Sequence, residues 1–589
     1  MPHDTLADQA LKQLSGILEK NGSSLSGPGH TAIGALLSAL EAGLKNQLPP
    51  QYLLSSIDPG MGKTLSVAQF LRAWKAAGFV PASSVLVGVS RLEEIRTYLS
   101  HSGLTGQDVG VLTADPVMNA LGVPVEEHGA ARVLFTSQQM IASRTRGKSF
   151  SEATDFHYAG TPRPLRIWDE SFDPAEPVTM RVDDLAGLLA PLRGRHTKLA
   201  DEVKSLVQDA WGLADGQALT ISEGLAYRAR VAGTGGLVSE AVKTVRNLAR
   251  LGSQKLRLVE QHQAGTVLAG SAPSIPDDFA PAVIIDASGR VRETYRLWES
   301  HRGTLVRLPA AANDYRNLSI HLWERAAGRS ALRNPKDRKN IAAAIADAAN
   351  ANVASQWVVV HTKESVALMD EVATLVDGEP SRVRSLTWGE HRGTNRFVDV
   401  GNIVIVSDYA YNTPAYHAIG AAASGGAATA LTPRNINDIK RGEFQHNLLQ
   451  AVCRAAVRRS RDGVTGPCNA FVIVPPAQEL EDTISATFPG CSIMPWVPAA
   501  KELRGHVLEA TNYITDRLNA GGYQPVQKKD IRLHLGLTAP NFSQNVLAHT
   551  DFADFLRRNG LVITSRTVER MFTPYSIPDA YSCTDEGQQ

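Results

Sequence analysis

The sequence predicts an α/β protein of several domains, in which parallel sheets are covered by helices on both faces. The chain has 589 residues, too many for one ordinary core, and its 43% hydrophobic and 20% charged residues are typical of a globular protein. Short apolar runs alternate with helical segments from Tyr52 onward, as at residues 52–57, 133–137 and 403–406. Strands that are apolar throughout are typical of parallel sheets buried on both faces.

The spacing of apolar residues changes several times along the chain. The first segment has apolar residues at helical spacing, and a later one loses the strand-like runs and keeps helical periodicity. We therefore expect a helical N-terminal segment, a first α/β lobe, a helical insertion, a return to the first lobe, a second α/β lobe and a small C-terminal helical module, at residues 1–49, 50–179, 180–265, 266–311, 312–500 and 501–589.

Charge and hydropathy exclude several classes of protein. The chain has 60 Lys and Arg against 59 Asp and Glu, a net charge of +1, so a site for a polyanion must be a local patch. The apolar runs at 357–360 and 403–406 are far shorter than the roughly 20 residues that span a bilayer. The N-terminus lacks the pattern of a secretory signal, and the four cysteines form no CxxC pair typical of zinc or iron–sulfur sites. We expect a cytoplasmic protein without membrane contact.

The strongest chemical signal is the sequence Ile-Asp-Pro-Gly-Met-Gly-Lys-Thr at residues 57–64, between a strand-like run and a helical segment. In that context glycines let backbone N–H groups turn toward phosphates, and the positive end of the next helix faces the anion. Lys63 would reach the β- and γ-phosphates of ATP, and the Thr64 hydroxyl would ligate Mg²⁺. The predicted nucleotide-binding residues are Pro59, Gly60, Met61, Gly62, Lys63 and Thr64.

A second carboxylate motif follows about a hundred residues later. The apolar run at 165–168 ends in Asp169 and Glu170. Asp169 would hold Mg²⁺, and Glu170 would orient and deprotonate the attacking water. Hydrophobic residues followed by Asp-Glu are common, but after a phosphate loop at this distance the pattern indicates an ATP-hydrolysing site.

These motifs, with further elements in the same order, resemble the superfamily 1/superfamily 2 helicase and translocase group over roughly residues 50–500. The resemblance implies two RecA-like lobes that close on ATP and Mg²⁺. It assigns nucleic-acid contacts to loops that follow strands in both lobes, at Ser90, Arg91, Thr136, Ser137, Gln138, Arg392, Thr394 and Asn395. Asp286 and Ser288 resemble the element that links the γ-phosphate to strand movement.

The last helicase-like element is the segment that begins at Gln450. In the resembling group its arginines reach the γ-phosphate across the cleft between the lobes. This implies catalytic roles for Gln450, for Arg454 as the preferred finger and for Arg458 as the alternate. The fit departs from the family pattern because Cys453 replaces the usual glycine and the second arginine is shifted by one or two positions.

The segment 526–561 is basic and indicates a helix-turn-helix. Lys528, Lys529 and Arg532 would contact nucleic acid from its first helix, and polar residues at 541–545 begin the second. A plain helical bundle that docks on the core or on a partner protein accounts for this segment equally well.

Together these features favour an ATP-dependent helicase or translocase acting on nucleic acid, DNA rather than RNA. A protein partner could dock on the insertion or on the C-terminal module. Two alternatives stay open. A packaging-type motor would need a nuclease lobe with clustered acidic ligands, for which only Asp399 and Asp408 are candidates. A DNA-binding regulator would use ATP as a switch.

Overall fold

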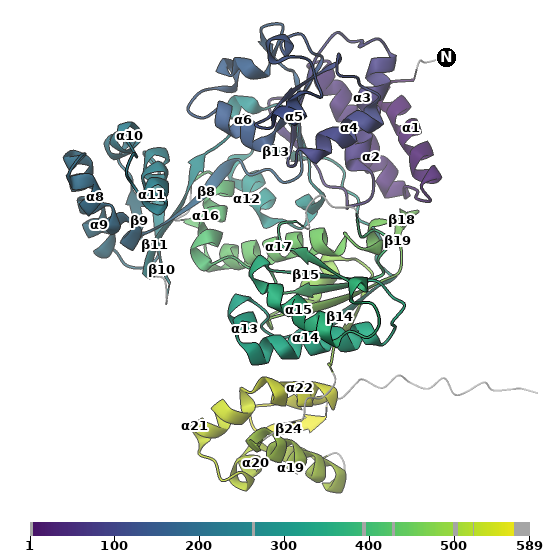
Figure 1. The fold of residues 1–589 in the computed structure, drawn as a ribbon, viewed down its shortest axis with the longest axis vertical. Helices are drawn as coiled ribbons and strands as arrows, with labels where there is room; N and C mark the ends of the chain where they lie inside the picture. The colour runs from purple at the N-terminus through teal and green to yellow at the C-terminus, as the bar shows by residue number, and fades with distance from the viewer. Residues whose placement is uncertain are drawn as a thin grey trace, which may run out of the picture.

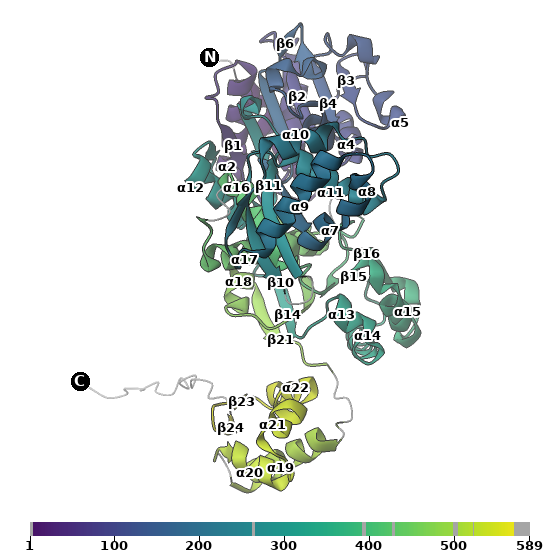
Figure 2. The same ribbon diagram turned by 90° about the vertical axis from the view of Figure 1, so that its left-hand side faces the viewer.

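The computed structural model describes residues 4–261, 265–390, 396–426, 430–498, 503, 505–521 and 524–570. Two parallel sheets form the main body, a mixed unit protrudes from it, and a small C-terminal unit lies at one end (Figures 1 and 2). The predicted mixed α/β class with parallel sheets is confirmed. Within the described part of the chain, no helix combines the length and the hydrophobicity needed to cross a bilayer.

The first sheet has seven strands in the order β13-β1-β12-β7-β2-β4-β3, and every neighbouring pair is parallel. Almost all residues of its central strands are buried, as expected for a sheet covered on both faces. The strands are β1 (Tyr52–Ser55), β2 (Val85–Val89), β3 (Val109–Leu112), β4 (Val133–Ser137), β7 (Leu165–Asp169), β12 (Ala282–Ile285) and β13 (Leu305–Arg307). Because parallel strands end at one edge, the segments after β1, β7 and β12 meet there.

The N-terminal segment folds as two helices, α1 (Leu6–Lys20) and α2 (Gly27–Leu44), which pack with α3 (Lys63–Ala76). A capping box at Thr5 starts α1, since its hydroxyl accepts the Asp8 N–H while the Asp8 carboxylate accepts the Thr5 N–H. Their apolar faces merge with the core of the first sheet. Helix α4 (Glu93–Ser102) lies beside α3.

The predicted helical insertion is wrong as a description of residues 180–265, because the structure has strands there. Its helices are α7 (Val182–Gly187), α8 (Leu189–Arg193), α9 (Thr197–Trp211), α10 (Glu223–Val231) and α11 (Ser239–Arg250). They pack on an antiparallel sheet of order β8-β11-β10-β9, with β8 (Ala175–Arg181), β9 (Ala218–Thr220), β10 (Lys255–Gln261) and β11 (Gly265–Pro273). Helix α11 ends at Arg250, and β10 begins five residues later. Leu256 and Leu258 in β10 are buried two residues apart, which is the alternation of a strand. The loop between the helix and this strand is short, so the sequence of the segment resembles a continuous helix.

The second sheet has six strands in the order β16-β15-β17-β20-β14-β21, all parallel. These are β14 (Leu318–Glu324), β15 (Trp357–His361), β16 (Val383–Thr387), β17 (Asn402–Val406), β20 (Cys468–Val474) and β21 (Ser492–Pro495). Its helices include α14 (Pro335–Asn350), α15 (Val366–Leu375), α17 (Pro433–Val452) and α18 (Leu480–Thr487). Helix α16 (Thr413–Ser424) instead packs on β8 and β11 of the protruding unit.

The C-terminal unit has the helices α19 (Gly505–Gly521), α20 (Lys528–His534), α21 (Ala539–Phe542) and α22 (Thr550–Arg558) around one small core. It also has a three-stranded sheet, β22-β24-β23, made of Val526–Gln527, Thr567–Arg570 and Leu561–Ile563. Arg557 Nη2 donates to the Glu324 carbonyl at 3.2 Å, which ties this unit to the end of β14.

A buried ion pair joins the segment after β12 to α17. Arg292 Nε donates to Glu443 Oε1 at 2.7 Å, and both side chains are almost fully buried. Removing one partner of a buried pair typically costs about 3–5 kcal/mol. Arg292 Nη1 also lies 3.5 Å from Asp173 Oδ1, so the loss of Glu443 leaves the Arg292 charge partly compensated and the cost at the lower end of that range.

We therefore expect Glu443→Ala to lower the free energy of unfolding by about 3 kcal/mol. Urea denaturation followed by intrinsic fluorescence measures this. Glu481→Ala, at an exposed position of α18, is the matched control. Equal midpoints for the two variants would show that the pair does not hold these elements together.

Candidate nucleotide site

The loop after β1 has the shape of an anion cradle. Gly60 and Gly62 both have a φ of 88°, which L-residues with side chains rarely adopt. A Cβ at Gly60 would lie 1.9 Å from the Arg458 carbonyl oxygen, so the loop and the second sheet's segment approach too closely for a side chain. Helix α3 starts at Lys63, and its N-terminal N–H groups face the loop.

The Lys63 ammonium is held by the loop itself. Its Nζ donates to the carbonyl oxygens of Ile57 and, at 3.2 Å, of Asp58. Burial lowers the pKa of Lys63, while the Glu170 and Asp58 carboxylates favour its charged form. The ammonium is therefore a partly buried cation that carbonyl dipoles hold beside the cavity.

The two predicted acidic residues lie at the carboxyl end of β7. Asp169 Oδ2 accepts from Tyr98 Oη at 2.6 Å and from Thr64 Oγ1 at 3.3 Å. Burial and the neighbouring Glu170 carboxylate raise the pKa of Asp169 to about 7. Glu170 has a φ of 82°, and its N–H donates to the Ile285 carbonyl at 3.1 Å, so a strained backbone aims it into the cavity.

A third carboxylate, Glu94, completes an acidic wall that sequence reasoning missed. It lies on α4, accepts the Arg91 N–H at 3.2 Å and lines the same cavity as Glu170. Burial, together with the Asp169 and Glu170 carboxylates, raises the pKa of Glu94 to about 8. No motif marks Glu94, since its role depends on α4 packing beside α3.

One cavity of about 300 Å³ collects these groups and the arginines of the second sheet. Gln450, Arg454 and Arg458, at and after the end of α17, face Lys63 and Glu170 across it. Gln450 Oε1 accepts from Arg454 Nη2 at 2.7 Å. Burial, with the positive charge of Arg458, lowers the pKa of Arg454 to about 10. The lining also includes residues that sequence reasoning did not identify, namely Leu18, Asn21, Thr97 and His101.

The predicted coupling residues lie in a buried chain of hydrogen bonds. Ser288 Oγ donates to Asp286 Oδ1 at 2.7 Å and lies 2.7 Å from His446 Nδ1 on α17. On the other side, Tyr295 Oη donates to Asp286 Oδ2 at 2.8 Å and accepts the Phe172 N–H at 3.0 Å. This chain connects the segment after Glu170 with α17.

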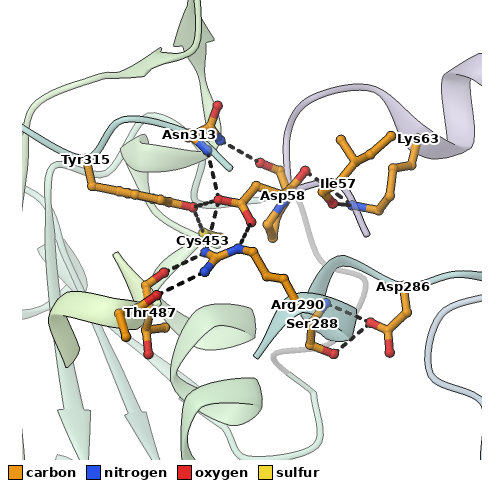
Figure 3. A network of polar contacts seen from close by, with 12 residues as sticks. Ile57, Asp58, Lys63, Asp286, Ser288, Arg290, Asn313, Tyr315, Cys453 and Thr487 are labelled. Carbon is orange, nitrogen blue, oxygen red and sulfur yellow. Dashed lines mark hydrogen bonds and ion pairs between the residues drawn. The ribbon is translucent and has the colours of Figure 1, made fainter. Parts of the chain in front are cut away.

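A second buried network anchors the cradle (Figure 3). The Asp58 carboxylate is fully buried and accepts from Arg290 Nε at 2.7 Å, from Tyr315 Oη at 2.8 Å and from the Asn313 N–H at 2.9 Å. Arg290 Nη2 also donates to the Thr487 carbonyl at the end of α18, at 2.6 Å. The cradle is thereby tied to elements of the second sheet.

The predicted nucleic-acid residues of the first sheet have varied surroundings. Ser90 Oγ lies 3.4 Å from Glu94 Oε2, and Arg91 Nη2 donates to the Gly389 carbonyl at 2.6 Å, across to the second sheet. Thr136 is a correction, because it is fully buried and its hydroxyl donates to the Leu112 carbonyl, so it has no surface for a ligand. Ser137 caps α6 (Gln138–Arg144), and Gln138 Nε2 donates to the Asp169 carbonyl at 2.6 Å.

Of the other predicted nucleic-acid residues, those of the second lobe lie outside the described residues and those of the C-terminal unit lie inside them. Arg392, Thr394 and Asn395 lie outside them. In the C-terminal unit Lys529 is exposed, Lys528 Nζ donates to the Thr564 carbonyl at 3.3 Å, and Arg532 Nη1 donates to the Leu537 carbonyl at 3.1 Å. The Met61 side chain is buried against the N-terminal helices at Gly29 and does not line the cavity, so the predicted contact of Met61 with a nucleotide would be made by its backbone N–H.

The donor set fits a nucleotide with Mg²⁺. Thr64 Oγ1 and Asp169 Oδ2 are oxygen donors 3.3 Å apart at the end of the cradle, and Mg²⁺ prefers oxygen ligands and keeps several waters. Within the described residues, no three His, Cys, Asp or Glu side chains are grouped as ligands for a metal. Asp399, one of two acidic candidates for a nuclease lobe, is paired with Arg459 at 2.7 Å.

The comparisons with known proteins give only distant matches. No family model matches the sequence, and no curated protein does. Solved structures that match include S. tokodaii Xpd4, with a TM-score of 0.42 and 12% identity over 78% of this chain and 99% of that one. The DUF1998 helicase MrfA bound to DNA and AMPPNP matches with a TM-score of 0.35 and 10% identity over 99% of this chain, which spans 64% of MrfA.

The acidic wall predicts a pH dependence of stability. The folded protein has pKa values of about 8 for Glu94 and about 7 for Asp169, above the ordinary values of 4.5 and 3.8, so between those limits it binds more protons than the unfolded chain. Stability should therefore fall as pH rises from about 4 through 8. We expect the unfolding temperature of the ligand-free protein to fall less steeply in Glu94→Gln than in the parent, as measured by scanning fluorimetry from pH 5 to 9.

The neighbouring exposed residue provides the control for this prediction. Glu93→Gln removes a carboxylate from the same turn of α4 outside the cavity, and should keep the parent's slope. A slope in Glu94→Gln that matches the parent's would contradict the buried cluster.

Proposed function

We propose that this protein is a nucleic-acid-dependent ATPase of helicase type, in which two RecA-like lobes close on ATP. The lobes would be residues 50–179 with 266–311 and residues 312–500, with the protruding unit inserted into the first. The proposal is supported chiefly by one observation: a cradle lysine, a strand-end glutamate and two arginines from the other sheet line a single cavity. Phosphoryl transfer depends on such positioning and charge.

The chain's own residues divide the work. Lys63, released from its carbonyl partners, would bind the β- and γ-phosphates of ATP. Thr64 and Asp169 would hold Mg²⁺, which when bound neutralises phosphate charge. The Glu170 carboxylate would orient the attacking water and accept its proton. Arg454 or Arg458 would stabilise the charge on the transferred group.

The nucleic-acid partner, DNA rather than RNA, would contact surface loops of both lobes and the C-terminal unit. Arg91 of the first lobe donates to the Gly389 carbonyl of the second lobe. A nucleic-acid strand bound at Arg91 would therefore affect how the two lobes are placed relative to one another. The C-terminal unit supports duplex binding, because a turn joins α20 to α21 and exposed polar side chains follow, with Asn541 on α21 and Ser543, Gln544 and Asn545 in the π-helical segment after it.

Two substitutions test the catalytic assignment. Lys63→Ala and Glu170→Gln should each lower ATP turnover at least a hundredfold, because one removes phosphate binding and the other the general base. Phosphate release measured with single-stranded DNA, duplex DNA and RNA gives the rates. Lys243→Ala, at an exposed position of the insertion, is the control. Parent-like turnover in Lys63→Ala would show that hydrolysis occurs elsewhere.

The C-terminal unit predicts a salt-dependent duplex contact. If Lys529 binds a phosphate, Lys529→Gln should reduce the log–log salt slope of duplex binding by about 0.9. Fluorescence anisotropy of a labelled duplex between 50 and 200 mM salt measures the slope. Lys336→Gln, exposed on α14, should leave it unchanged. Identical slopes in both variants would indicate that this unit packs or binds a partner instead.

A further inference from the structure

The turn between α1 and α2 lies between the nucleotide cavity and the segment that carries the arginines. Leu18 and Asn21, at the end of α1, line the cavity. A Cβ at Gly62 of the cradle would lie 3.2 Å from Leu14 Cδ1 and 3.8 Å from Leu18 Cδ2, so α1 packs directly on the cradle. Residues 21–26, which we call the strap, continue from this contact to the second sheet's side of the cavity.

The strap has a defined backbone because both of its ends are capped. Gly22 has a φ of 72°, and the Ser23 N–H donates to the Leu18 carbonyl at 2.8 Å. A left-handed glycine with this bond is typical of the Schellman motif that ends a helix. At the other end, Ser26 Oγ accepts the Gly29 N–H at 3.2 Å and starts α2. The strap therefore presents its remaining side chains in fixed directions.

A tight β-hairpin follows the arginines and meets the strap. Its strands β18 (Ser460–Arg461) and β19 (Val464–Thr465) are antiparallel and lie beside the N-terminal helices (Figure 1). Between them Asp462 and Gly463 have φ values of 51° and 76°, as a type I′ turn requires, and Asp-Gly is a favoured sequence for that turn. A Cβ at Gly463 would lie 2.8 Å from Ser26 Cβ, so the tip of the hairpin approaches the strap closely.

Ser24 and Asp462 exchange two hydrogen bonds across this contact. Ser24 Oγ donates to Asp462 Oδ1 at 2.7 Å, and the Asp462 N–H donates back to Ser24 Oγ at 2.9 Å. The Ser24 N–H also donates to the Ser460 carbonyl at 3.3 Å. Hydrogen bonds to an ionised carboxylate are stronger than those between neutral groups. The strap and the hairpin are thus joined by side chain and backbone together.

The hairpin in turn holds the backbone of the arginine segment, residues 454–459. Arg458 lies two residues before β18, and its carbonyl oxygen is the atom that comes within 1.9 Å of a Cβ at Gly60. The Gly466 N–H, just after β19, donates to the Arg459 carbonyl at 3.0 Å. The segment is therefore held by α17 on one side and by the hairpin on the other. A shift of the hairpin would move the arginines relative to the cradle.

We propose that Ser24 and Asp462 are positioning residues for the arginine segment, through which the strap keeps Arg454 and Arg458 beside the phosphates. The inference deepens the proposed function and rests on it, because it concerns the same ATP-hydrolysing site. Arginines of this kind act on the charge of the transferred group. A displaced segment would therefore slow the chemical step and leave the binding of ADP unchanged.

Ser24→Ala tests the inference through ATP turnover at varied ATP concentration. The kcat should fall about tenfold with KM unchanged, because one bond to a carboxylate is lost and its effect is felt in the transition state. Ser24→Thr keeps the hydroxyl and should behave like the parent, and Ser23→Ala, in the same strap, is the matched control. The Asp314 N–H still donates to the Gly463 carbonyl at 2.7 Å in these variants, so the hairpin should stay folded, with an unfolding temperature near the parent's.

The partner residue gives a second test. Asp462→Gly removes the acceptor and tolerates the positive φ, so it should lower kcat as Ser24→Ala does. Asp462→Asn keeps an acceptor oxygen and should retain most of the rate. The double variant Ser24→Ala with Asp462→Gly should lose no more than either single variant, as expected of two residues that act through one contact. Losses that add would contradict the proposal.

Fluorescent ADP with tetrafluoroaluminate, which mimics the transferred phosphoryl group, gives a readout without turnover. Ser24→Ala should weaken this complex about tenfold relative to Ser23→Ala and leave the affinity for ADP alone unchanged. A purely structural role would weaken both complexes alike, and would overturn the inference.

The two proposals fail in different ways. If Ser24→Ala matches Ser23→Ala in kcat and in both affinities, the inference is overturned, while turnover stimulated by nucleic acid leaves the proposed function standing. Turnover that nucleic acid does not stimulate removes the proposed function, and a tenfold difference between the two variants still supports the strap. A parent protein that neither hydrolyses ATP nor binds ADP with tetrafluoroaluminate overturns both.

Discussion

The position of the phosphate cradle depends on one buried carboxylate. Asp58 is fully buried, and a charge in that position is stable only when it is paired and fully hydrogen-bonded. Its partners Arg290, Asn313 and Tyr315 lie more than 230 residues later in the chain, and Arg290 also binds the carbonyl end of α18. The cradle is therefore built jointly by both sheets (Figure 3). Any movement of one sheet against the other must either preserve this network or break it at the full cost of an unpaired charge.

Two cations act on opposite sides of the same loop. Lys63 binds the carbonyls of Ile57 and Asp58 on the cavity side, while Arg290 holds the Asp58 carboxylate on the other. Under the proposed function, a phosphate would compete only for Lys63, because a phosphate's negative charge attracts the ammonium more strongly than carbonyl dipoles do. Releasing Lys63 leaves the loop anchored by Arg290, so the cradle keeps its shape while its cation changes partner. That arrangement is preorganised for an anion.

Local motifs could be predicted from the sequence, and long-range partners could not. Lys63, Thr64, Asp169 and Glu170 each follow a buried strand, and strands of a parallel sheet end at one edge, so pattern alone brought them together. Glu94 and Asp58 gained their roles from packing between distant segments, which no spacing encodes. Thr136 fits a polar loop in sequence, yet its β-strand position buries it. Sequence analysis missed the sheet of the insertion because two of its four strands lie outside the segment with helical periodicity. The two strands inside that segment were therefore assigned to helices.

Helix α17 reaches both the nucleotide cavity and a second cavity of about 530 Å³ at the carboxyl ends of β17 and β20, which is called the aromatic cavity here because Tyr411, Tyr416 and Phe444 line it. Lys440 and Gln450 lie ten residues apart on α17, a rise of about 15 Å, with Lys440 at the aromatic cavity and Gln450 at the nucleotide cavity. Helix α18 begins at the aromatic cavity and ends at the carbonyls that bind Arg290. A helix moves as a rigid rod over such lengths. If a ligand at one cavity shifted either helix, groups at the other cavity would move with it, and by thermodynamic reciprocity the coupling would have the same size in both directions.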